Sequence, residues 1–447
     1  MKSNNKLIDR DLTEDNSDIN SHKPYSNKKP KKLRELVTES KVYSLLSEYN
    51  STNKILHNIG SGLKNLGNTC YMNSALQCLM HTPSLCVYLA KGVHGRICTA
   101  RKRFCALCSL ERLVGETRIK SEGTVTPIEI FENIKVIGNQ FHMYKQEDSH
   151  EFIRCFIDAM QLSSIDFDLG MSRSLQDTSI VSHIFKGTLR SKITCDTCLK
   201  ESIITESFMD LSLEINSNSS LMEILNDFFK VDYLNNKNKY FCENCQRSND
   251  AIKQFSMDSR ILSFNHIAPL VLTCQLKRFN KNMEKITRQI SFTEVLDMSS
   301  FLTQPKERKQ RVVCKYKLFG VIVHNGCKLS SGHYYAYMRG LNEYWYKAND
   351  EDMSFVSIND VLNDNAYILF YQCQNLPIKR YEEKKYEERE QYKSKQGLEK
   401  EENKSDSILT GKRKKSEKLI KSKQILIRHK GLKSQSGTGH PVKINKT

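Results

Sequence analysis

One cysteine of this sequence stands where a nucleophile is expected, directly after a glycine-rich turn and at the start of a helical pattern. The turn covers Gly62 to Thr69, and apolar residues recur every three or four positions after Cys70. This spacing predicts a buried helix whose first turn presents the sulfur. A helix N-terminus lowers a thiol pKa, and a nearby imidazolium lowers it further, so we expect Cys70 to be largely a thiolate at neutral pH. Since a lone cysteine before an amphipathic helix is more often a buried structural residue, catalysis requires a base elsewhere in the chain.

A histidine far downstream supplies that candidate base. His333 lies in the segment Ser330–Tyr337, whose alternating aromatic residues predict a strand, and the polar segment 338–343 predicts a hairpin loop. The returning strand would bring Asn349 beside His333. An amide there would hold the imidazole in the tautomer that takes a proton from the thiol and later protonates a leaving amine. The order Cys, His, Asn therefore predicts nucleophilic catalysis by a thiol.

Five blocks of sequence, in this order, resemble the ubiquitin-specific protease family of cysteine deubiquitinases. They are Gly62–Ser74, Gln146–Phe152, Gln275–Phe279, Ser330–Tyr337 and Ala366–Tyr371. The resemblance implies that Cys70 is the nucleophile, His333 the general base and acid, and Asn349 the orienting third member. It also implies an α+β, papain-like fold with a thumb, a palm and zinc-tipped antiparallel β fingers. The implied reaction is hydrolysis, through an acyl-enzyme, of the bond after the C-terminal glycine of ubiquitin.

The resemblance also suggests roles for three neighbouring residues. Asn65, five residues before the cysteine, corresponds to the family's oxyanion-stabilising amide. Family members carry either Asp or Asn at the third triad position, and here Asn349 is followed by Asp350. We assign the role to Asn349 because it aligns with the first of the two polar positions, and Asp350 is then a neighbouring carboxylate that could stabilise charge. His324 competes for the role of the base, but we expect it to be structural because the family's catalytic histidine lies in Gly-His-Tyr.

The acidic block upstream of the second predicted helix is the candidate substrate channel. The ubiquitin tail ends in Leu-Arg-Gly-Gly, so the channel must be narrow and must offer carboxylates for an arginine. By resemblance, Gln146 and Asp148 grip that tail, and Glu151 is a weaker candidate. The alternative is that these residues form a helix N-terminal turn whose acidic groups complement the helix dipole, and both interpretations can hold for Glu147. A glycine at the scissile end suits a tunnel that has no room for a Cβ atom.

Two Cys-x2-Cys pairs predict a structural zinc site. The pairs are Cys195 with Cys198 and Cys242 with Cys245. Two such pairs complete a closed tetrahedral site of four thiolates. Disulfides are the alternative, and we do not expect them in a chain whose N-terminus shows no secretory signal. The flanking runs Gly187–Thr194 and Ile203–Leu213 read as strands, and they resemble the fingers that cradle the body of ubiquitin in this family.

A third cluster leaves a second metal site open. It consists of His94, Cys98, Cys105 and Cys108. Cys105 and Cys108 have ligand spacing, and some members of the family have a similar Cys-rich insertion after the catalytic helix. The alternative is that these are unpaired buried thiols, since the spacing of the first two residues is irregular.

Composition bounds the class of protein. The 447 residues include 15 cysteines, 38% hydrophobic residues and a formal net charge of +18. No apolar run reaches the roughly 18 residues of a membrane span, and Met1–Asn20 is polar. We therefore expect a soluble intracellular monomer with no membrane partner, in which cysteines act as thiols and metal ligands.

The expected domain organisation has a central enzyme and two extensions. Residues 1–60 should be largely disordered, apart from a short helix predicted near Leu33–Tyr49. The catalytic domain should cover 61–373, as a mostly helical lobe (about 61–180), the fingers (about 181–265) and a β-rich lobe (about 266–373).

The C-terminal extension, residues 374–447, predicts a largely disordered basic tail, with helix plausible only near 381–395. Residues 411–447 carry ten Lys and two Arg against one Glu, so 12 minus 1 gives +11 of the chain's +18. This tail predicts a nuclear or nucleolar localisation signal, with the cytoplasm as a second location, and contact with RNA or acidic partners. The alternative is a tail that only increases solubility.

Three other functions remain open from the sequence alone. A catalytically silent ubiquitin-binding scaffold is disfavoured because the triad is complete. A nucleic-acid-binding protein would explain the tail and both Cys clusters but not the Cys, His and Asn segments. Cleavage of another ubiquitin-like modifier is the third alternative.

Overall fold

The structure is a computed structural model, and it describes residues 59–98, 100, 103–120, 123–164, 177, 179–258, 268–280, 284–303, 313–328 and 331–374. The helices predicted near 33–49 and 381–395 and the basic tail lie outside the described residues.

A group of helices surrounds the cysteine segment. The helices before the first long strand are α2 (Cys70–Met80), α3 (Pro83–Ala90), α4 (Val93–Ile97), α5 (Ala106–Ile119), α6 (Ile128–Glu132), α7 (Ile134–Ile137), α8 (Ser149–Ser163) and α10 (Ile180–Phe185). Every residue of α2 is buried, because this helix packs against both α8 and the strand β13 (Ser331–Arg339). A helix covered on all sides is typical of a domain core. The predicted helix after Cys70 is therefore confirmed, and it holds its first residue in a fixed place.

A large sheet carries the histidine segment. Its eight strands follow the order β15 (Asp352–Val356), β14 (Trp345–Asn349), β13, β12 (Lys315–Lys328), β16 (Ala366–Cys373), β10 (Val271–Lys277) and β5 (Leu211–Glu214), with β11 (Val295–Asp297) beside β12. Neighbours are antiparallel except for β5 and β10. The short helix α12 (Ile358–Leu362) connects β15 to β16, and η3 (Ser299–Phe301) follows β11. The hairpin predicted after His333 is confirmed as β13 and β14.

Both faces of the central part of this sheet are buried, and its central strands are mostly apolar. In β13, Tyr334, Ala336 and Met338 belong to the apolar cluster that contains α2. Tyr337 belongs to a second cluster on the other face, together with residues of helix α11 (Leu221–Phe229). The alternation follows from the two-residue period of a strand. Packing on both faces fixes the register of β13 and hence the position of its histidine.

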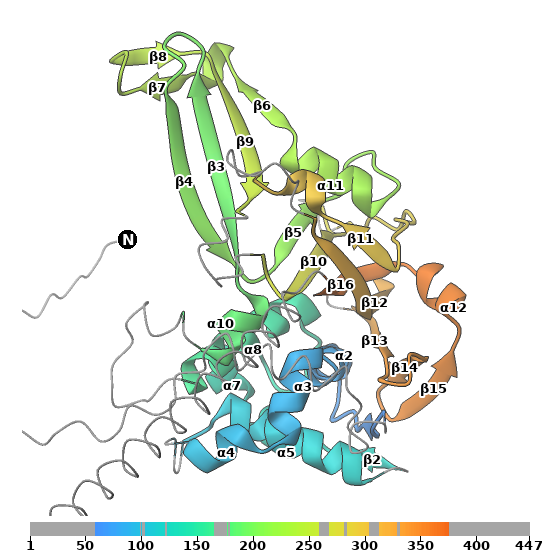
Figure 1. The fold of residues 1–447 in the computed structure, drawn as a ribbon. Helices are drawn as coiled ribbons and strands as arrows, with labels where there is room; N and C mark the ends of the chain where they lie inside the picture. The colour runs from blue at the N-terminus through green and yellow to red at the C-terminus, as the bar shows by residue number, and fades with distance from the viewer. Residues whose placement is uncertain are drawn as a thin grey trace, which may run out of the picture. The chain divides into compact units, whose positions relative to one another are not determined.

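A separate four-stranded sheet extends from this body (Figure 1). Its order is β4 (Glu201–Phe208), β3 (Gly187–Cys195), β9 (Ala251–Met257) and β6 (Val231–Leu234), all antiparallel. The hairpin of β7 (Tyr240–Cys242) and β8 (Arg247–Asn249) lies at its far end, after η2 (Asn236–Asn238). Helices gathered on one part and antiparallel sheets on the other make an α+β fold, as predicted.

One strand prediction is wrong in its extent. The run Ile203–Leu213 was expected to be continuous, but the structure divides it into β4 and β5, which are separated at Met209 and Asp210. The chain leaves the four-stranded sheet at this point and joins the large sheet beside β10. The strand β5 and the helix α11 thus lie within the range expected for the fingers, but they pack with the large sheet.

A two-stranded parallel pair joins β1 (Gly62–Leu63), just before the cysteine turn, to β2 (Thr124–Val125). Within the described part of the chain, no helix has the length and apolar character that crossing a membrane requires.

Candidate active site

The turn before Cys70 is held by side chains of its own sequence. The Asn65 Oδ1 atom accepts hydrogen bonds from the Gly67 N–H at 2.9 Å and the Thr69 N–H at 3.2 Å, and the Leu66 N–H donates to Thr69 Oγ1 at 2.9 Å. Gly67 has φ +99°, a left-handed conformation that glycine adopts without strain. These bonds satisfy N–H groups at the entrance of α2 and place Cys70 as its first residue.

The thiol of Cys70 differs from the sequence expectation. Cys70 is only 3% exposed, and burial is the main cause that raises the pKa of its thiol, with a further increase from the charge of Asp350. A hydrogen bond with the backbone of Tyr334 acts in the opposite direction but does not cancel these effects. The predicted low pKa is therefore wrong for this arrangement, because desolvation outweighs the helix N-terminus. The resting thiol is protonated at neutral pH.

The predicted pairing of His333 with Asn349 is confirmed. Their contact joins His333 Nε2 and Asn349 Oδ1 at 2.5 Å, across the neighbouring antiparallel strands β13 and β14. When Nε2–H donates to this amide oxygen, Nδ1 carries the lone pair that a general base requires. Among the described residues, no hydrogen bond joins His333 to Cys70, although the sulfur contacts the backbone of the adjacent Tyr334.

A network of amides around Asp350 was only partly expected. The carboxylate accepts from Asn65 Nδ2 and from Asn73 Nδ2, both at 2.8 Å, and the Asp350 carbonyl accepts from the Leu63 N–H at 2.7 Å. Asp350 has φ +51°. Sequence reasoning missed Asn73, although its place three residues after Cys70 puts both on neighbouring positions of one helix face. The network ties the cysteine turn, α2 and the end of β14 together.

The competing histidine lies inside the protein. His324 is 2% exposed, and its ring lies 4.5 Å from the ring of Tyr334 and 5.7 Å from that of Phe279, measured between centroids. Neither ring nitrogen has a hydrogen-bond partner within the described residues. Burial, followed by the nearby charges of Lys285 and His333, lowers its pKa to about 4. This neutral, enclosed ring agrees with a structural role.

Gln146 and Asp148 lie between the helices and the large sheet. The Gln146 side chain exchanges two hydrogen bonds with the backbone of Gly332, the residue before His333, at 2.5 and 3.0 Å. Asp148 is the N-cap of α8 and accepts from the His150 N–H at 2.8 Å and from the Tyr367 hydroxyl at 2.8 and 2.9 Å. Burial raises the pKa of the Asp148 carboxyl. The capping interpretation therefore holds for Asp148, whereas the Glu147 carboxylate instead accepts from the His142 N–H.

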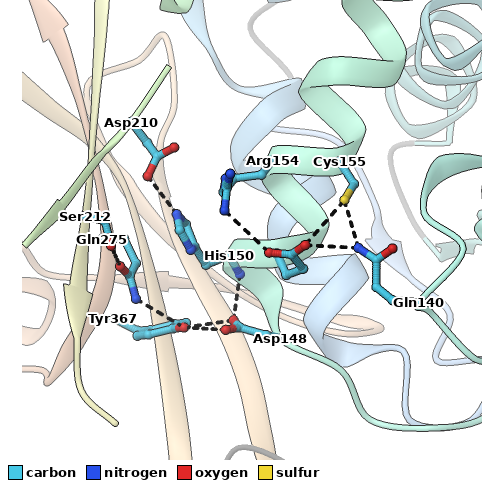
Figure 2. Close-up of polar contacts among 10 residues, drawn as sticks. Gln140, Asp148, His150, Arg154, Cys155, Asp210, Ser212, Gln275 and Tyr367 are labelled. Atoms are coloured by element: carbon cyan, nitrogen blue, oxygen red, sulfur yellow. Dashed lines mark hydrogen bonds and ion pairs between the residues drawn. The ribbon is translucent and has the colours of Figure 1, made fainter. Parts of the chain in front are cut away.

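Glu151 presents the more accessible carboxylate. Figure 2 shows Gln140 and Cys155 on one side of α8, and Arg154, His150 and Asp148 toward the other. The Glu151 carboxylate accepts from Gln140 Nε2 at 3.0 Å and lies 3.7 Å from the Arg154 guanidinium. Its side chain is 43% exposed. His150, on the side of Asp148, pairs with Asp210 at 2.8 Å (Figure 2).

The four fingertip cysteines meet as the sequence predicted. Ligand atoms of Cys195, Cys198, Cys242 and Cys245 all lie within 4.8 Å of one another. Four thiolates about 2.3 Å from one zinc ion would be separated by about 3.8 Å in a tetrahedron, and Cys198 Sγ lies 3.6 Å from Cys242 Sγ. A hydrogen bond with the backbone of Cys198 is the main cause that lowers the pKa of Cys195 to about 6. The separation of the sulfur atoms therefore fits a zinc ion bound by four thiolates.

The third cluster also closes into one site. Ligand atoms of His94, Cys98, Cys105 and Cys108 lie within 4.8 Å of one another. His94 Nε2 lies 3.1 Å from Cys105 Sγ, and hydrogen bonds, first with Cys108 and then with His94, lower the pKa of the Cys105 thiol to about 3. One imidazole and three sulfurs are a known structural zinc set. The irregular spacing at His94 and Cys98 is accommodated because α4 folds back onto α5.

Comparisons with known proteins identify the family to which this chain is similar. The family model described as Ubiquitin carboxyl-terminal hydrolase matches residues 61–371. Ubiquitin carboxyl-terminal hydrolase 25 of Arabidopsis thaliana is 39% identical over 323 residues, which are 70% of this chain and 47% of that protein. Probable ubiquitin carboxyl-terminal hydrolase 16 of Schizosaccharomyces pombe is 38% identical over 318 residues, covering 70% of this chain and 66% of that protein. The chain thus spans between about half and two thirds of the length of these relatives.

Solved structures give the same result. The structure described as the SAGA Ubp8/Sgf11/Sus1/Sgf73 DUB module bound to ubiquitin aldehyde matches with a TM-score of 0.61 and 28% sequence identity. The match covers 74% of this chain and 73% of that one. A structure of the yeast SAGA DUBm matches with a TM-score of 0.59 and 30% identity over 72% of this chain and 70% of that one.

Proposed function

The chain belongs to the ubiquitin carboxyl-terminal hydrolase family, and on this premise we propose that it is a thiol-dependent deubiquitinase. It hydrolyses the bond after the C-terminal glycine of ubiquitin in conjugates or chains. The observation that carries this proposal is the bond between His333 and Asn349, on the strand against which the Cys70 helix packs. The proposal is supported by the ubiquitin aldehyde bound in the matching DUB module.

In the proposed mechanism, His333 removes the proton from Cys70, and the thiolate attacks the glycine carbonyl. The carbonyl carbon forms a bond to sulfur, and the C–N bond breaks as His333 returns the proton to the leaving amine. Water then hydrolyses the thioester with His333 as the base. The Asn349 amide oxygen accepts the hydrogen bond from His333 Nε2–H, so Nδ1 is the nitrogen that takes and returns the proton. Because the resting thiol is protonated and not bonded to His333, a small approach of the two groups must precede attack.

Asn65 stabilises the oxyanion in this proposal. Its Oδ1 atom is fixed by the turn and one amide N–H donates to Asp350. Within the described residues, its second amide N–H has no partner and is available to the developing negative charge. A donor held in place before the reaction costs no reorganisation during it. Asp350 is therefore proposed to act through Asn65, not on the substrate itself.

We propose that Gln146 and Asp148 bind the backbone of the ubiquitin tail and that Glu151 binds its charged arginine side chain. Gln146 pairs with the Gly332 peptide group through one N–H and one lone pair, and the remaining N–H and lone pair of its amide can pair with the extended ubiquitin tail. The buried Asp148 carboxylate already accepts hydrogen bonds from the His150 N–H and the Tyr367 hydroxyl. It therefore has room for one further neutral donor, such as a backbone N–H of the tail, and not for a guanidinium. The exposed Glu151 carboxylate is the better partner for an arginine of the tail, which reverses the order that the sequence suggested.

Two structural zinc ions complete the proposed enzyme. The fingertip set, Cys195, Cys198, Cys242 and Cys245, would join β3 to the hairpin of β7 and β8. The set of His94, Cys98, Cys105 and Cys108 would join α4 to α5, which packs against α2. Zinc bound to four protein ligands has no open position, so both ions would stabilise the fold and take no part in the chemistry.

The basic tail is proposed to direct the protein to the nucleus or nucleolus and to contact RNA or acidic partners. The support is its concentration of charge, +11 in residues 411–447 as counted above. Its role is proposed to be separate from catalysis, which the described residues support without it.

Hydrolysis of a fluorogenic ubiquitin C-terminal amide and of diubiquitin tests the main proposal. We expect turnover by the zinc-loaded full chain and none by Cys70→Ala, while Cys70→Ala still binds ubiquitin. Turnover that survives in Cys70→Ala would place the nucleophile elsewhere.

A further inference from the structure

A lysine outside the sequence motifs binds the strand next to the candidate catalytic histidine. Lys285 Nζ donates to the His324 carbonyl at 2.6 Å and to the Gly326 carbonyl at 2.9 Å. These two carbonyls flank Asn325, and Asn325 is the residue of β12 that pairs with His333 of β13. The ammonium thus fixes β12 directly opposite the histidine.

The paired ends of β12 and β13 have little room to adjust. The pairing of β12 with β13 is irregular between Asn325 and Lys328. A Cβ atom on Gly332 would lie 2.3 Å from His324 Nε2, and one on Gly326 would lie 2.5 Å from the Gly332 Cα atom. Because the two strand ends touch so closely, a shift of β12 at residues 324–326 would move Gly332 and therefore His333.

Backbone contacts on both sides of Lys285 anchor it to the large sheet. It bridges to Phe279 in a short antiparallel contact, and the Ile286 N–H donates to the Arg278 carbonyl at 2.6 Å. The Arg278 side chain is 1% exposed and donates to the carbonyls of Ala366 and Ile286. The base of the lysine is thereby anchored to β10 and to the start of β16.

The surroundings of the ammonium also favour a positioning role. Among the residues that the structure describes, no carboxylate pairs with Lys285, whereas Lys277, eight positions earlier, pairs with Glu214 at 3.2 Å. Burial is the main cause that lowers the pKa of Lys285. Within the described part of the chain, the partners of this partly buried cation are two carbonyls, and their hydrogen bonds must offset the free energy lost when the ammonium is removed from water.

We infer that Lys285 is a positioning residue for the proposed reaction: by binding the carbonyls of His324 and Gly326, it holds the paired ends of β12 and β13 so that His333 stays within reach of Cys70. On the opposite side, the two bonds between Gln146 and Gly332 hold the same paired ends. The inference rests on the proposed deubiquitinase function and adds a residue to its machinery. Lys285 does not touch the reacting atoms, so its effect is on the geometry of the base.

The test compares Lys285→Met with wild type and with Lys285→Arg, using a fluorogenic ubiquitin C-terminal amide. A displacement of a catalytic group by about 1 Å can cost roughly 100-fold, so we expect kcat to fall about 10- to 100-fold in Lys285→Met. The ubiquitin Kd, measured in a Cys70→Ala background, should change less than about threefold, because Lys285 is not proposed to bind substrate. Lys285→Arg keeps two donors and should restore kcat to within about threefold of wild type.

Lys277→Met is the matched control, because it removes an exposed ammonium at the end of β10, whose neighbours in the sheet are β16 and β5 rather than β12. This variant should keep wild-type kcat. An unchanged kcat in folded Lys285→Met, or a loss that appears only in Kd, would overturn the inference. If Lys285→Met does not fold, Lys285→Arg decides, because a variant with both hydrogen bonds should be active.

Alkylation of Cys70 by iodoacetamide, followed by peptide mass spectrometry, separates this inference from the function on which it rests. If wild type failed to cleave ubiquitin, the function would fail, but alkylation would still report on the Cys70–His333 pair. A Lys285→Met rate equal to that of His333→Ala supports the inference, and a rate equal to wild type contradicts it.

Discussion

At the scale of residues, the central feature is a nucleophile that is buried and protonated at rest. Burial raises the pKa of Cys70, and His333 bonds Asn349 but not the thiol. A protonated thiol is a poor nucleophile and is slow to oxidise. The arrangement would therefore make the resting cysteine react slowly, and its reactivity would rise whenever the imidazole approaches the sulfur.

The hydrogen bond between Asp350 and Asn65 predicts that the effects of their substitution on kcat are not additive. Asn65→Ala should lower kcat about 100- to 1000-fold, since it removes one oxyanion donor. Asp350→Ala should also lower kcat, because Asn65 loses the carboxylate that orients its amide. If Asp350 acts through Asn65, adding Asp350→Ala to Asn65→Ala should cost less than about threefold more. Steady-state kinetics of the four proteins measure this, and fully additive losses would show that Asp350 acts independently.

His324 gives a prediction about pH. Its pKa is lowered to about 4, so the folded protein binds fewer protons here than the unfolded chain. The contribution of His324 to the free energy of unfolding is therefore fully present above about pH 6.5, the pKa of an unperturbed histidine. It is lost as the pH falls toward 4, because the unfolded chain takes up the proton first. Between pH 7 and pH 5, the free energy of unfolding should fall by about 1–2 kcal/mol more in wild type than in His324→Phe.

Urea unfolding at the two pH values measures this difference, and metal release at low pH affects both proteins equally. His142→Phe is the control, because the His142 side chain is 51% exposed. Equal pH dependence in wild type and His324→Phe would contradict the burial of a neutral ring.

At the scale of elements, the two Cys clusters predict the metal content. Native mass spectrometry should find two zinc ions per chain, one fewer in Cys242→Ser and one fewer in Cys108→Ser. Each variant should also unfold at a lower temperature, because zinc bound by the folded state stabilises it. Cys327→Ser, which changes an exposed cysteine outside both clusters, should match wild type. Unchanged zinc content and stability in Cys242→Ser would remove the fingertip site.

The elements that carry the site were largely predictable from the sequence. The periodicity after Cys70 predicted α2, and the alternation after His333 predicted the hairpin that brings Asn349 to the imidazole. The passage from β4 to β5 was not predictable, because β5 pairs in parallel with the distant β10, and no local signal records such pairing. The pKa of Cys70 was missed for a similar reason. Its burial is made by β13, more than two hundred residues away.

At the scale of the whole molecule, the enzyme and the tail should separate. We expect deletion of residues 375–447 to leave kcat on a small ubiquitin substrate within about twofold, because the proposed site lies within the described residues. The same deletion should abolish nuclear accumulation of a fluorescent fusion and reduce salt-sensitive RNA binding. Deletion of residues 1–58 is the control for localisation. Nuclear accumulation that persists without the tail would assign the signal to another part of the chain.

The most direct test of the central claim is labelling of the purified, zinc-loaded full chain with a ubiquitin probe that carries a C-terminal electrophile. We expect one ubiquitin adduct, located on Cys70, that is absent in Cys70→Ser and much weaker with a matched probe built on another ubiquitin-like protein. An adduct that persists in Cys70→Ser, or folded wild-type protein that forms none, would contradict the central claim.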